Sequence, residues 1–157
     1  MIAKSAKPER ALRADWPALT ALWEASVRAT HHFLAEADIR EIRAALEPEY
    51  FPQVELWVAR GTGGQPLAFL GVSEGAAQAR VEMLFVHPAA FGHGHGTRLL
   101  RHAVEELGAS EVDVNEQNPA ALAFYRARGF TVTGRSERDG QGRPFPLLHL
   151  RLTQPTD

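Results

Sequence analysis

The sequence contains no cysteine at all, and this absence excludes several kinds of chemistry. Disulfide bonds, cysteine-ligated zinc, thiol redox reactions and a cysteine nucleophile all depend on that residue. Lysine is nearly absent too, because Lys4 and Lys7 are the only two and every other basic residue is an arginine. No lysine lies close to the glycine-rich segment at residues 92–96, which excludes the Walker A motif of nucleotide-binding proteins.

The chain also lacks a strong charge of one sign and any long apolar run. It carries 17 Lys and Arg against 19 Asp and Glu, a formal net charge of -2. Nucleic-acid binding usually needs a basic face, so this balance predicts no nucleic-acid partner. No segment approaches the roughly 18 apolar residues of a membrane span, and residues 1–16 lack the apolar core of a signal peptide. These absences predict a cytoplasmic protein without a membrane partner.

What is present suffices for one folded domain that covers residues 1–157, of which 45% are hydrophobic. A chain of about 150 residues buries roughly 70% of the surface that its unfolded form exposes, so it needs no metal or disulfide to hold a core. We expect Asp15 to cap the first helix, with Pro17 in its first turn, and Glu47-Pro48 to end the second helix.

Helical spacing and short β-rich runs alternate along the chain, which predicts a mixed α/β fold. The order of the elements predicts a mostly antiparallel sheet with one parallel crossover through the glycine-rich segment. The predicted helices cover residues 16–29, 37–46, 96–107 and 119–128, and the predicted strands cover residues 2–6, 55–60, 66–73, 79–86, 111–115, 130–137 and 144–152.

The glycine-rich segment follows a predicted strand and opens a helix. In this arrangement glycines let backbone N–H groups approach an anion at the helix N-terminus, so a phosphate site and a purely structural turn are both open. The Rossmann spacing fails, because Gly92 and Gly94 would require a third glycine at Thr97, and Gly94 and Gly96 would require one at Leu99.

Two spaced motifs resemble the GCN5-related N-acetyltransferase (GNAT) family. Residues 91–96, Phe-Gly-His-Gly-His-Gly, are similar to its loop Arg/Gln-x-x-Gly-x-Gly/Ala, with Phe91 in place of Arg or Gln. Residues 118–130 are similar to its segment Asn-x-x-Ala-x-x-Phe-Tyr-x-x-x-Gly-Phe. Further segments at 29–34, 114–118, 134–137 and 144–148 resemble the YjaB-like branch, for which peptidyl-lysine is the acceptor.

The resemblance implies the GNAT fold, in which the strands at 79–86 and 111–115 splay apart and helices cover both faces of the sheet. It also implies acetyl-CoA as cofactor. Backbone groups of Leu84 and Val86 are expected to pair with the pantetheine arm, and Asn118 to cap a helix and hydrogen-bond to the cofactor. The expected pyrophosphate site consists of Phe91, Gly92, His93, Gly94, His95, Gly96 and Thr97.

Three catalytic residues are expected from the same resemblance and from the chemistry of amine acetylation. Tyr125 is expected to protonate the leaving thiolate, with a packing role as the alternative. Glu82, the only acid of its strand, is the candidate general base, with a solvent-facing role equally open, and Glu116 is its rival. Without cysteine, the acetyl group would pass directly to the amine in a ternary complex.

The histidines are interpreted as ligand-binding residues. His93 and His95 diverge on a loop without an acidic partner, so no metal site is predicted, and their protonated imidazoles are expected to add positive charge beside the pyrophosphate. His31, His32 and Phe33 interrupt the helical pattern and are expected to border the acceptor site, with a surface turn as the alternative.

The function predicted is acetyl transfer from acetyl-CoA to a primary amine, such as a protein lysine. Acetylation of a small amine or an antibiotic is one alternative, and an acyl-CoA-binding sensor without turnover is another. The oligomeric state stays open between monomer and homodimer. Self-acetylation of side chains would be confined to Lys4 and Lys7.

Overall fold

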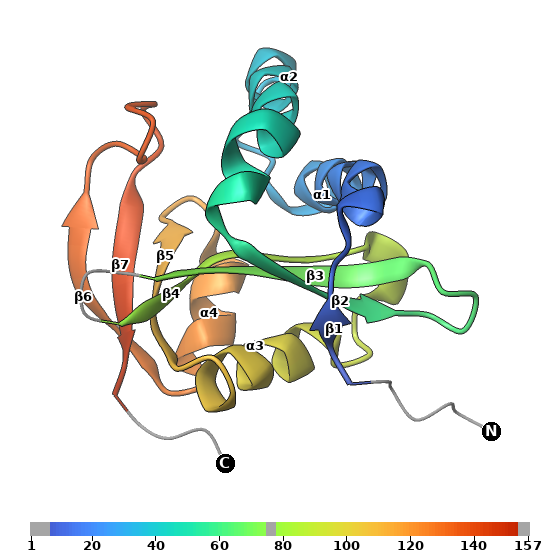
Figure 1. Ribbon diagram of the computed structural model, residues 1–157. Coiled ribbons are helices and arrows are strands. Elements are labelled where there is room, and N and C mark those ends of the chain that lie inside the picture. Colours follow the sequence, from blue (N-terminus) through green and yellow to red (C-terminus); the bar gives the residue numbers. More distant parts are fainter. Residues whose placement is uncertain (1–6, 75–77, 154–157) are drawn as a thin grey trace.

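The computed structural model describes residues 7–74 and 78–153, which form one seven-stranded sheet with helices on both faces (Figure 1). The predicted strand at residues 2–6 lies outside the described residues. The strands are β1 (Glu9–Arg10), β2 (Glu55–Arg60), β3 (Pro66–Glu74), β4 (Ala79–Val86), β5 (Ala109–Asn115), β6 (Phe130–Ser136) and β7 (Leu147–Leu152). The longer helices are α1 (Trp16–Thr30), α2 (Glu36–Ala45), α3 (His95–Glu105) and α4 (Pro119–Arg126), and the short turns are η1 (Arg13–Asp15), η2 (Leu46–Tyr50), η3 (Phe51–Gln53) and η4 (Pro88–Ala90).

The strand order is β1-β2-β3-β4-β5-β7-β6, and only the pair β4/β5 is parallel. The predicted mixed α/β fold, with a mostly antiparallel sheet and one parallel crossover through the glycine-rich segment, is therefore confirmed. No helix in the described part of the chain has the length and apolar character needed to cross a membrane.

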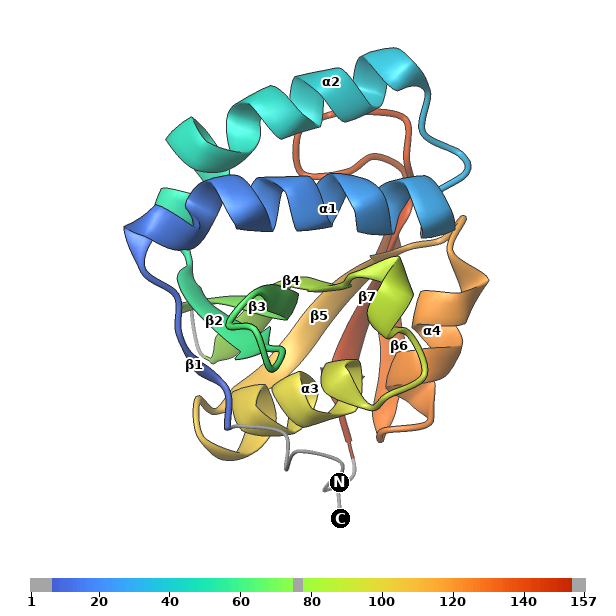
Figure 2. The ribbon, with the colours of Figure 1, turned by 90° about the vertical axis from the view of Figure 1, so that its right-hand side faces the viewer.

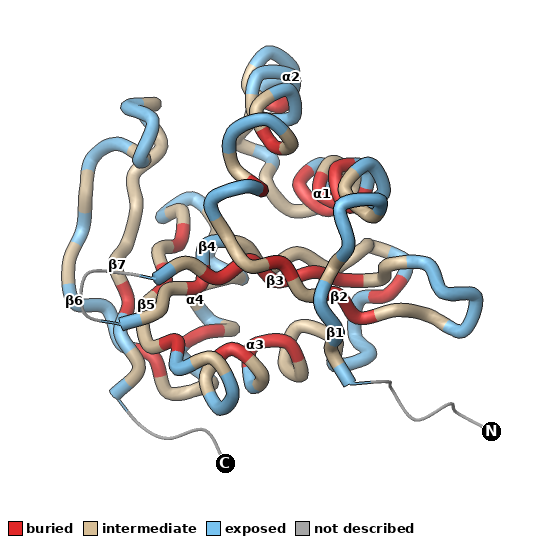
Figure 3. Tube along the Cα trace, in the orientation of Figure 1, coloured by how far each residue is buried: buried red, intermediate tan, exposed pale blue. Residues whose placement is uncertain are grey.

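Two helical layers sandwich the sheet (Figure 2). Helix α1 packs on β3 and β4, while α3 and α4 pack on the opposite face, α3 against β2 to β5 and α4 against β5 and β6. Each layer has its own apolar core, visible as the buried segments of Figure 3. The α1 layer buries Leu19, Leu22, Trp23 and Val27, which recur at helical spacing as the sequence predicts.

Three local predictions are corrected by the structure. Asp15 does not cap α1: its carboxylate accepts a hydrogen bond from the Leu12 N–H at 2.8 Å and pairs with Arg60 at 2.8 Å. The chain does not leave the helical region at Glu47-Pro48, because the π-helical turn η2 follows α2 and holds Pro48 in its first turn, where no N–H donor is needed. Strand β7 starts only at Leu147, since prolines upstream lack the donor that a central strand needs.

The parallel pair β4/β5 is short, and this opens the sheet. Pairing joins only Ala79–Val81 to Ala109–Val112, so the strands separate beyond those residues. A β-bulge lies at the same point: Val72 opposes Val81 and Gly71 opposes Met83, which leaves Glu82 as the extra residue. The predicted splay is confirmed, and the bulge places Glu82 at its start.

Candidate active site

The separation of β4 from β5 creates a cleft of about 160 Å³. Its polar side chains come from both strands, from α4 and from the loop after α1, and its other lining residues are apolar. The residues that line it are His31, Val81, Glu82, Met83, Leu84, Phe85, Val112, Asp113, Val114, Asn115, Asn118, Ala121 and Tyr125. Two of the three predicted catalytic residues, Glu82 and Tyr125, therefore meet in one cleft.

A larger cavity of about 360 Å³ lies on the α1 and α2 side of β4. Glu82, Met83 and Phe85 line both cavities, so they form the wall that the two share. The remaining lining residues of the larger cavity are Trp23, Ile42, Leu46, Tyr50, Gln53, Val54, Ser73 and Gln141. Two molecules, one bound in each cavity, would therefore both contact Glu82.

Tyr125 is 6% exposed and packs edge-on against Phe124 and Phe130, with ring centroids 5.1 and 5.6 Å away. Burial raises the pKa of Tyr125 well above its usual value of about 10. Within residues 7–74 and 78–153, no group hydrogen-bonds to its hydroxyl. The phenol is therefore a neutral proton donor whose hydrogen bond is available to a ligand in the cleft.

Glu82 is held by two donors on a single oxygen. Its Oε1 accepts from Ser73 Oγ at 3.0 Å and from Arg80 Nε at 3.3 Å. Among the described residues, none donates to Oε2, and the side chain is 40% exposed. One carboxylate oxygen thus remains able to accept a proton at the wall between the cavities.

Glu116, the rival base, is engaged elsewhere. Both of its carboxylate oxygens accept from Arg135, at 2.7 and 3.0 Å, and this hydrogen bonding lowers its pKa. It does not line the cleft. A paired, exposed carboxylate outside the cleft is a poorer proton acceptor than Glu82.

The backbone of the glycine-rich loop is left-handed at two glycines before α3. Gly92 and Gly94 have φ values of 80° and 82°, and Gly94 directly precedes α3. This left-handed conformation suits glycine, and the N–H groups of the first helical turn have no partner within the helix. Gly96 lies against Phe124 and Val86, since an added Cβ would be 3.5 and 3.7 Å from them. Phe91 is exposed at 44%, which places it on the surface at the start of the loop.

Arg98 of α3 contacts the glycine-rich loop and was not predicted from the sequence. Its guanidinium donates to the His93 carbonyl at 2.9 Å and lies 3.1 Å from His95 Nδ1. Burial, with the charges of Arg98 and His93, lowers the pKa of His95. Arg98 therefore places a positive charge beside the loop, and the expected contribution of a protonated His95 is not favoured. Helical spacing from Gly94 was the signal that could have identified Arg98.

Arg128 is a second residue that was not predicted from the sequence. Thr97 Oγ1 accepts from it at 2.7 and 3.1 Å, and its guanidinium lies 3.8 Å from the centre of the Phe124 ring. These contacts join the start of α3 to the end of α4. Thr97 is therefore committed to a contact within the protein through its side chain.

The remaining predicted cofactor residues lie where β4 and α4 face the cleft. Leu84 and Val86 pair with β3 on one side, while the other edge of β4 is not paired with β5 at these positions. Their side chains pack into the core beside α3 and α4. The Asn118 side chain accepts from the Ala121 N–H at 3.2 Å, so the predicted helix cap is confirmed.

The three predicted acceptor residues do not all line the cleft, although the ring centroid of Phe33 lies 5.5 Å from that of His31. His31 lines the cleft, with its ring centroid 6.2 Å from that of Phe85, and burial lowers its pKa to about 4. His32 is exposed to solvent. Phe33 contacts Phe145 of the β6–β7 connection, with ring centroids 5.6 Å apart. The structure therefore brings only a neutral His31 to the cleft.

The histidines of the loop do not form a metal site with acids. The rings of His93 and His95 lie 6.4 Å apart. Across the described part of the chain, no group of three or more His, Cys, Asp or Glu residues is arranged to hold a metal ion.

Comparison with known proteins gives consistent matches. A family model described as an acetyltransferase (GNAT) domain matches residues 52–132. The peptidyl-lysine N-acetyltransferase YjaB of Escherichia coli K12 is 41% identical over 132 residues, which cover 84% of this chain and 86% of that protein. YjaB of Salmonella typhimurium is 39% identical over 84% of this chain and 88% of its own.

Solved structures share the fold. The solution structure of apo-form YjaB from Escherichia coli has a TM-score of 0.82 at 37% identity, covering 94% of this chain and 97% of that one. The crystal structure of PaiA N-acetyltransferase from Thermoplasma acidophilum in complex with coenzyme A has a TM-score of 0.72 at 18% identity, covering 93% of this chain and 98% of that one.

Proposed function

The chain belongs to the acetyltransferase (GNAT) domain family, and from that premise we propose that it transfers acetyl from acetyl-CoA directly to the amine of a protein lysine. The observation that carries this proposal is the shared wall at Glu82. Glu82 lines the larger cavity and the cleft, and Tyr125 lines the cleft. The names of the relatives support a protein lysine as acceptor.

The residues present fit acetyl-CoA. The free edge of β4 at Leu84 and Val86 offers backbone groups to an extended chain, and the first turn of α3 offers N–H groups to a pyrophosphate. Arg98 adds positive charge beside that turn. Bound acetyl-CoA supplies a thioester with a carbonyl open to attack and a sulfur that can leave.

The roles of the side chains follow from their positions. Glu82 Oε2 accepts the proton of the acceptor amine, directly or through water. The Tyr125 hydroxyl gives its proton to the departing sulfur, and burial keeps it protonated for that step. His31 stays neutral, so it does not repel a cationic acceptor near the cleft. Glu82 is preferred to Glu116 as the base because Arg135 occupies both oxygens of Glu116.

We infer that residues 1–157 form one acetyltransferase domain and that the protein is located in the cytoplasm. A thiol-release assay with a lysine-containing peptide tests it, with the same peptide acetylated on lysine as the blank. We expect free thiol and acetyllysine in equal amounts. Thiol release with small amines or aminoglycosides alone would favour a small amine or an antibiotic as the acceptor. CoA binding without thiol release would indicate a sensor.

The choice of base is tested by two matched variants. Glu82→Gln should remove the acidic limb of the pH profile of kcat/KM, whereas Glu116→Gln should keep it, because Glu82 lines the cleft and Glu116 does not. The reverse result would assign the base to Glu116.

A further inference from the structure

The half of the sheet formed by β5, β7 and β6 has a polar face opposite α3 and α4. Val112 and Val114 of β5 pack into the α3/α4 core, as do Leu148 and Leu150 of β7. Because side chains alternate along a strand, Asp113 and His149 project from the other face. The core beneath α1 draws its strand residues only from β2, β3 and β4.

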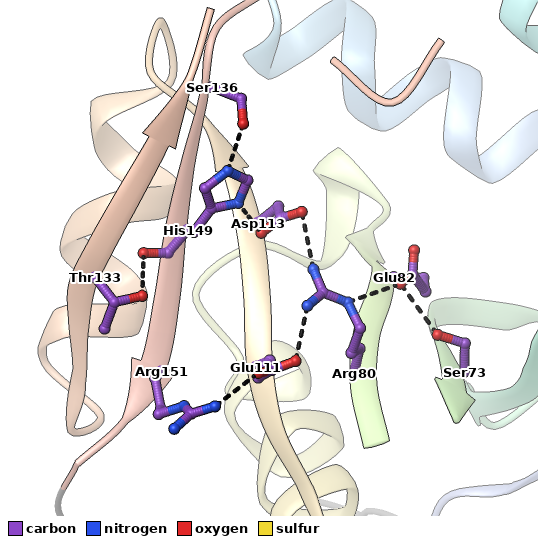
Figure 4. Close-up of polar contacts among 9 residues, drawn as sticks. All are labelled: Ser73, Arg80, Glu82, Glu111, Asp113, Thr133, Ser136, His149 and Arg151. Carbon is purple, nitrogen blue, oxygen red and sulfur yellow. Dashed lines mark hydrogen bonds and ion pairs between the residues drawn. The ribbon is translucent and has the colours of Figure 1, made fainter. Parts of the chain in front are cut away.

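Three side chains on this face form a hydrogen-bonded chain (Figure 4). Asp113 Oδ1 lies 2.7 Å from His149 Nδ1, and His149 Nε2 lies 2.6 Å from Ser136 Oγ. An ionised carboxylate can only accept, which assigns the imidazole proton to Nδ1. Nε2 is then the acceptor for the serine hydroxyl. This is the connectivity of a serine hydrolase triad, supplied by three strands.

Neighbouring groups hold these three hydrogen-bonded side chains in place. The second oxygen of Asp113 pairs with Arg80 at 2.8 Å, so the carboxylate is held on both sides. Gly134 stands opposite His149 in the strand register, and a Cβ added there would lie 3.4 Å from His149 Cδ2. The missing side chain leaves the imidazole room to lie between Asp113 and Ser136.

We propose that Ser136 is the nucleophile of a second catalytic site that hydrolyses small acyl esters. Ser136 lies on the edge strand β6 and is partly exposed, so an ester can reach it from solvent. His149 is the general base, and Asp113 is a positioning residue that holds the imidazole tautomer. The reaction does not require acetyl-CoA, and of the three residues only Asp113 also lines the cleft.

The reaction has two halves. Ser136 Oγ bonds to the ester carbonyl carbon while its proton moves to His149 Nε2. The bond from that carbon to the alcohol oxygen breaks, and the oxygen leaves with the electron pair and takes the proton from Nε2. Water then attacks the acyl-serine, giving its proton to Nε2, and Ser136 Oγ leaves and recovers that proton. One ester and one water become one acid and one alcohol.

A fluorophosphonate probe, which labels activated serines, and p-nitrophenyl acetate test the site. In the native protein, we expect peptide mass spectrometry to find the probe on Ser136, and Ser136→Ala to remove both the label and the hydrolysis that depends on it. His149→Gln should slow labelling by about 100-fold or more, since general-base assistance is lost.

Thr133→Val is the matched control, because Thr133 hydrogen-bonds to the backbone oxygen of His149 and not to its ring. Its labelling rate should equal that of the unaltered protein, with folding of every variant checked by circular dichroism. Labelling of native protein no faster than of heat-denatured protein would overturn the proposal. Labelling of folded His149→Gln at the rate of the unaltered protein, or a label on another residue, would also overturn the proposal.

Discussion

At the scale of single residues, burial determines the charge state of two groups in the cleft. Tyr125 stays protonated and His31 stays neutral, because the protein interior disfavours the phenolate and the imidazolium. Tyr125→Phe keeps the packing against Phe130 and removes only the hydroxyl. We expect kcat to fall by about 10²–10⁴-fold with little change in the KM for acetyl-CoA. Steady-state kinetics measures this, and an unchanged kcat would leave Tyr125 with a packing role.

His31 also makes stability depend on pH. Its folded pKa of about 4 lies below the reference value of 6.5, so between these values the unfolded chain binds the extra proton. The stabilising contribution is complete above pH about 6.5 and is lost as the pH falls towards 4, a change of about 2–3 kcal/mol. Urea unfolding between pH 4 and 7.5 should show a shallower pH dependence for His31→Gln. The exposed His32→Gln should behave like the unaltered protein.

At the scale of the element, α4 depends on its first residue. The Asn118 side chain satisfies the Ala121 N–H, one of the donors that a helix start leaves without a partner. Asn118→Ala should lower the free energy of unfolding by about 1 kcal/mol, whereas Asn118→Ser keeps an oxygen acceptor and most of the stability. Chemical denaturation compares the two, and equal losses would show that the cap contributes nothing.

At the scale of the whole molecule, the described strands of the two halves of the sheet pair only along the short β4/β5 ladder, where Arg80 joins both strands. Arg80 bridges Glu82, Glu111 and Asp113 with 28% of its side chain exposed. Arg80→Met should cost about 1–3 kcal/mol, because partly buried carboxylates lose their partner. Arg151→Met is the control: among the described residues Arg151 pairs with Glu111 alone, its side chain is 53% exposed, and its loss should cost under about 1 kcal/mol. The denaturation midpoints of the two variants measure this difference in stability.

The sequence was informative where a local pattern determines the structure. Apolar periodicity predicted α1 and most strands, and the Asn118-Pro119 pair predicted the start of α4. The prediction that Asp15 caps α1 was wrong because its carboxylate pairs with Arg60, which is distant in sequence. The contacts of Arg98 and Thr97, and the separation of Glu116 from the cleft, depend on tertiary packing that no local pattern records. The meeting of Asp113, Ser136 and His149 depends on strand order and register.

The bulge in β4 makes Glu82 an insertion that the pairing with β3 does not require. With Glu82 deleted, Val81 and Met83 would become neighbours opposite Val72 and Gly71, and the alternation of side chains between the two cores would continue. Deletion of one residue inside a central strand normally reverses every later side chain, yet here it should leave a folded protein that binds acetyl-CoA and releases no thiol. Calorimetry together with the thiol assay checks this, and an unfolded deletion variant would contradict it.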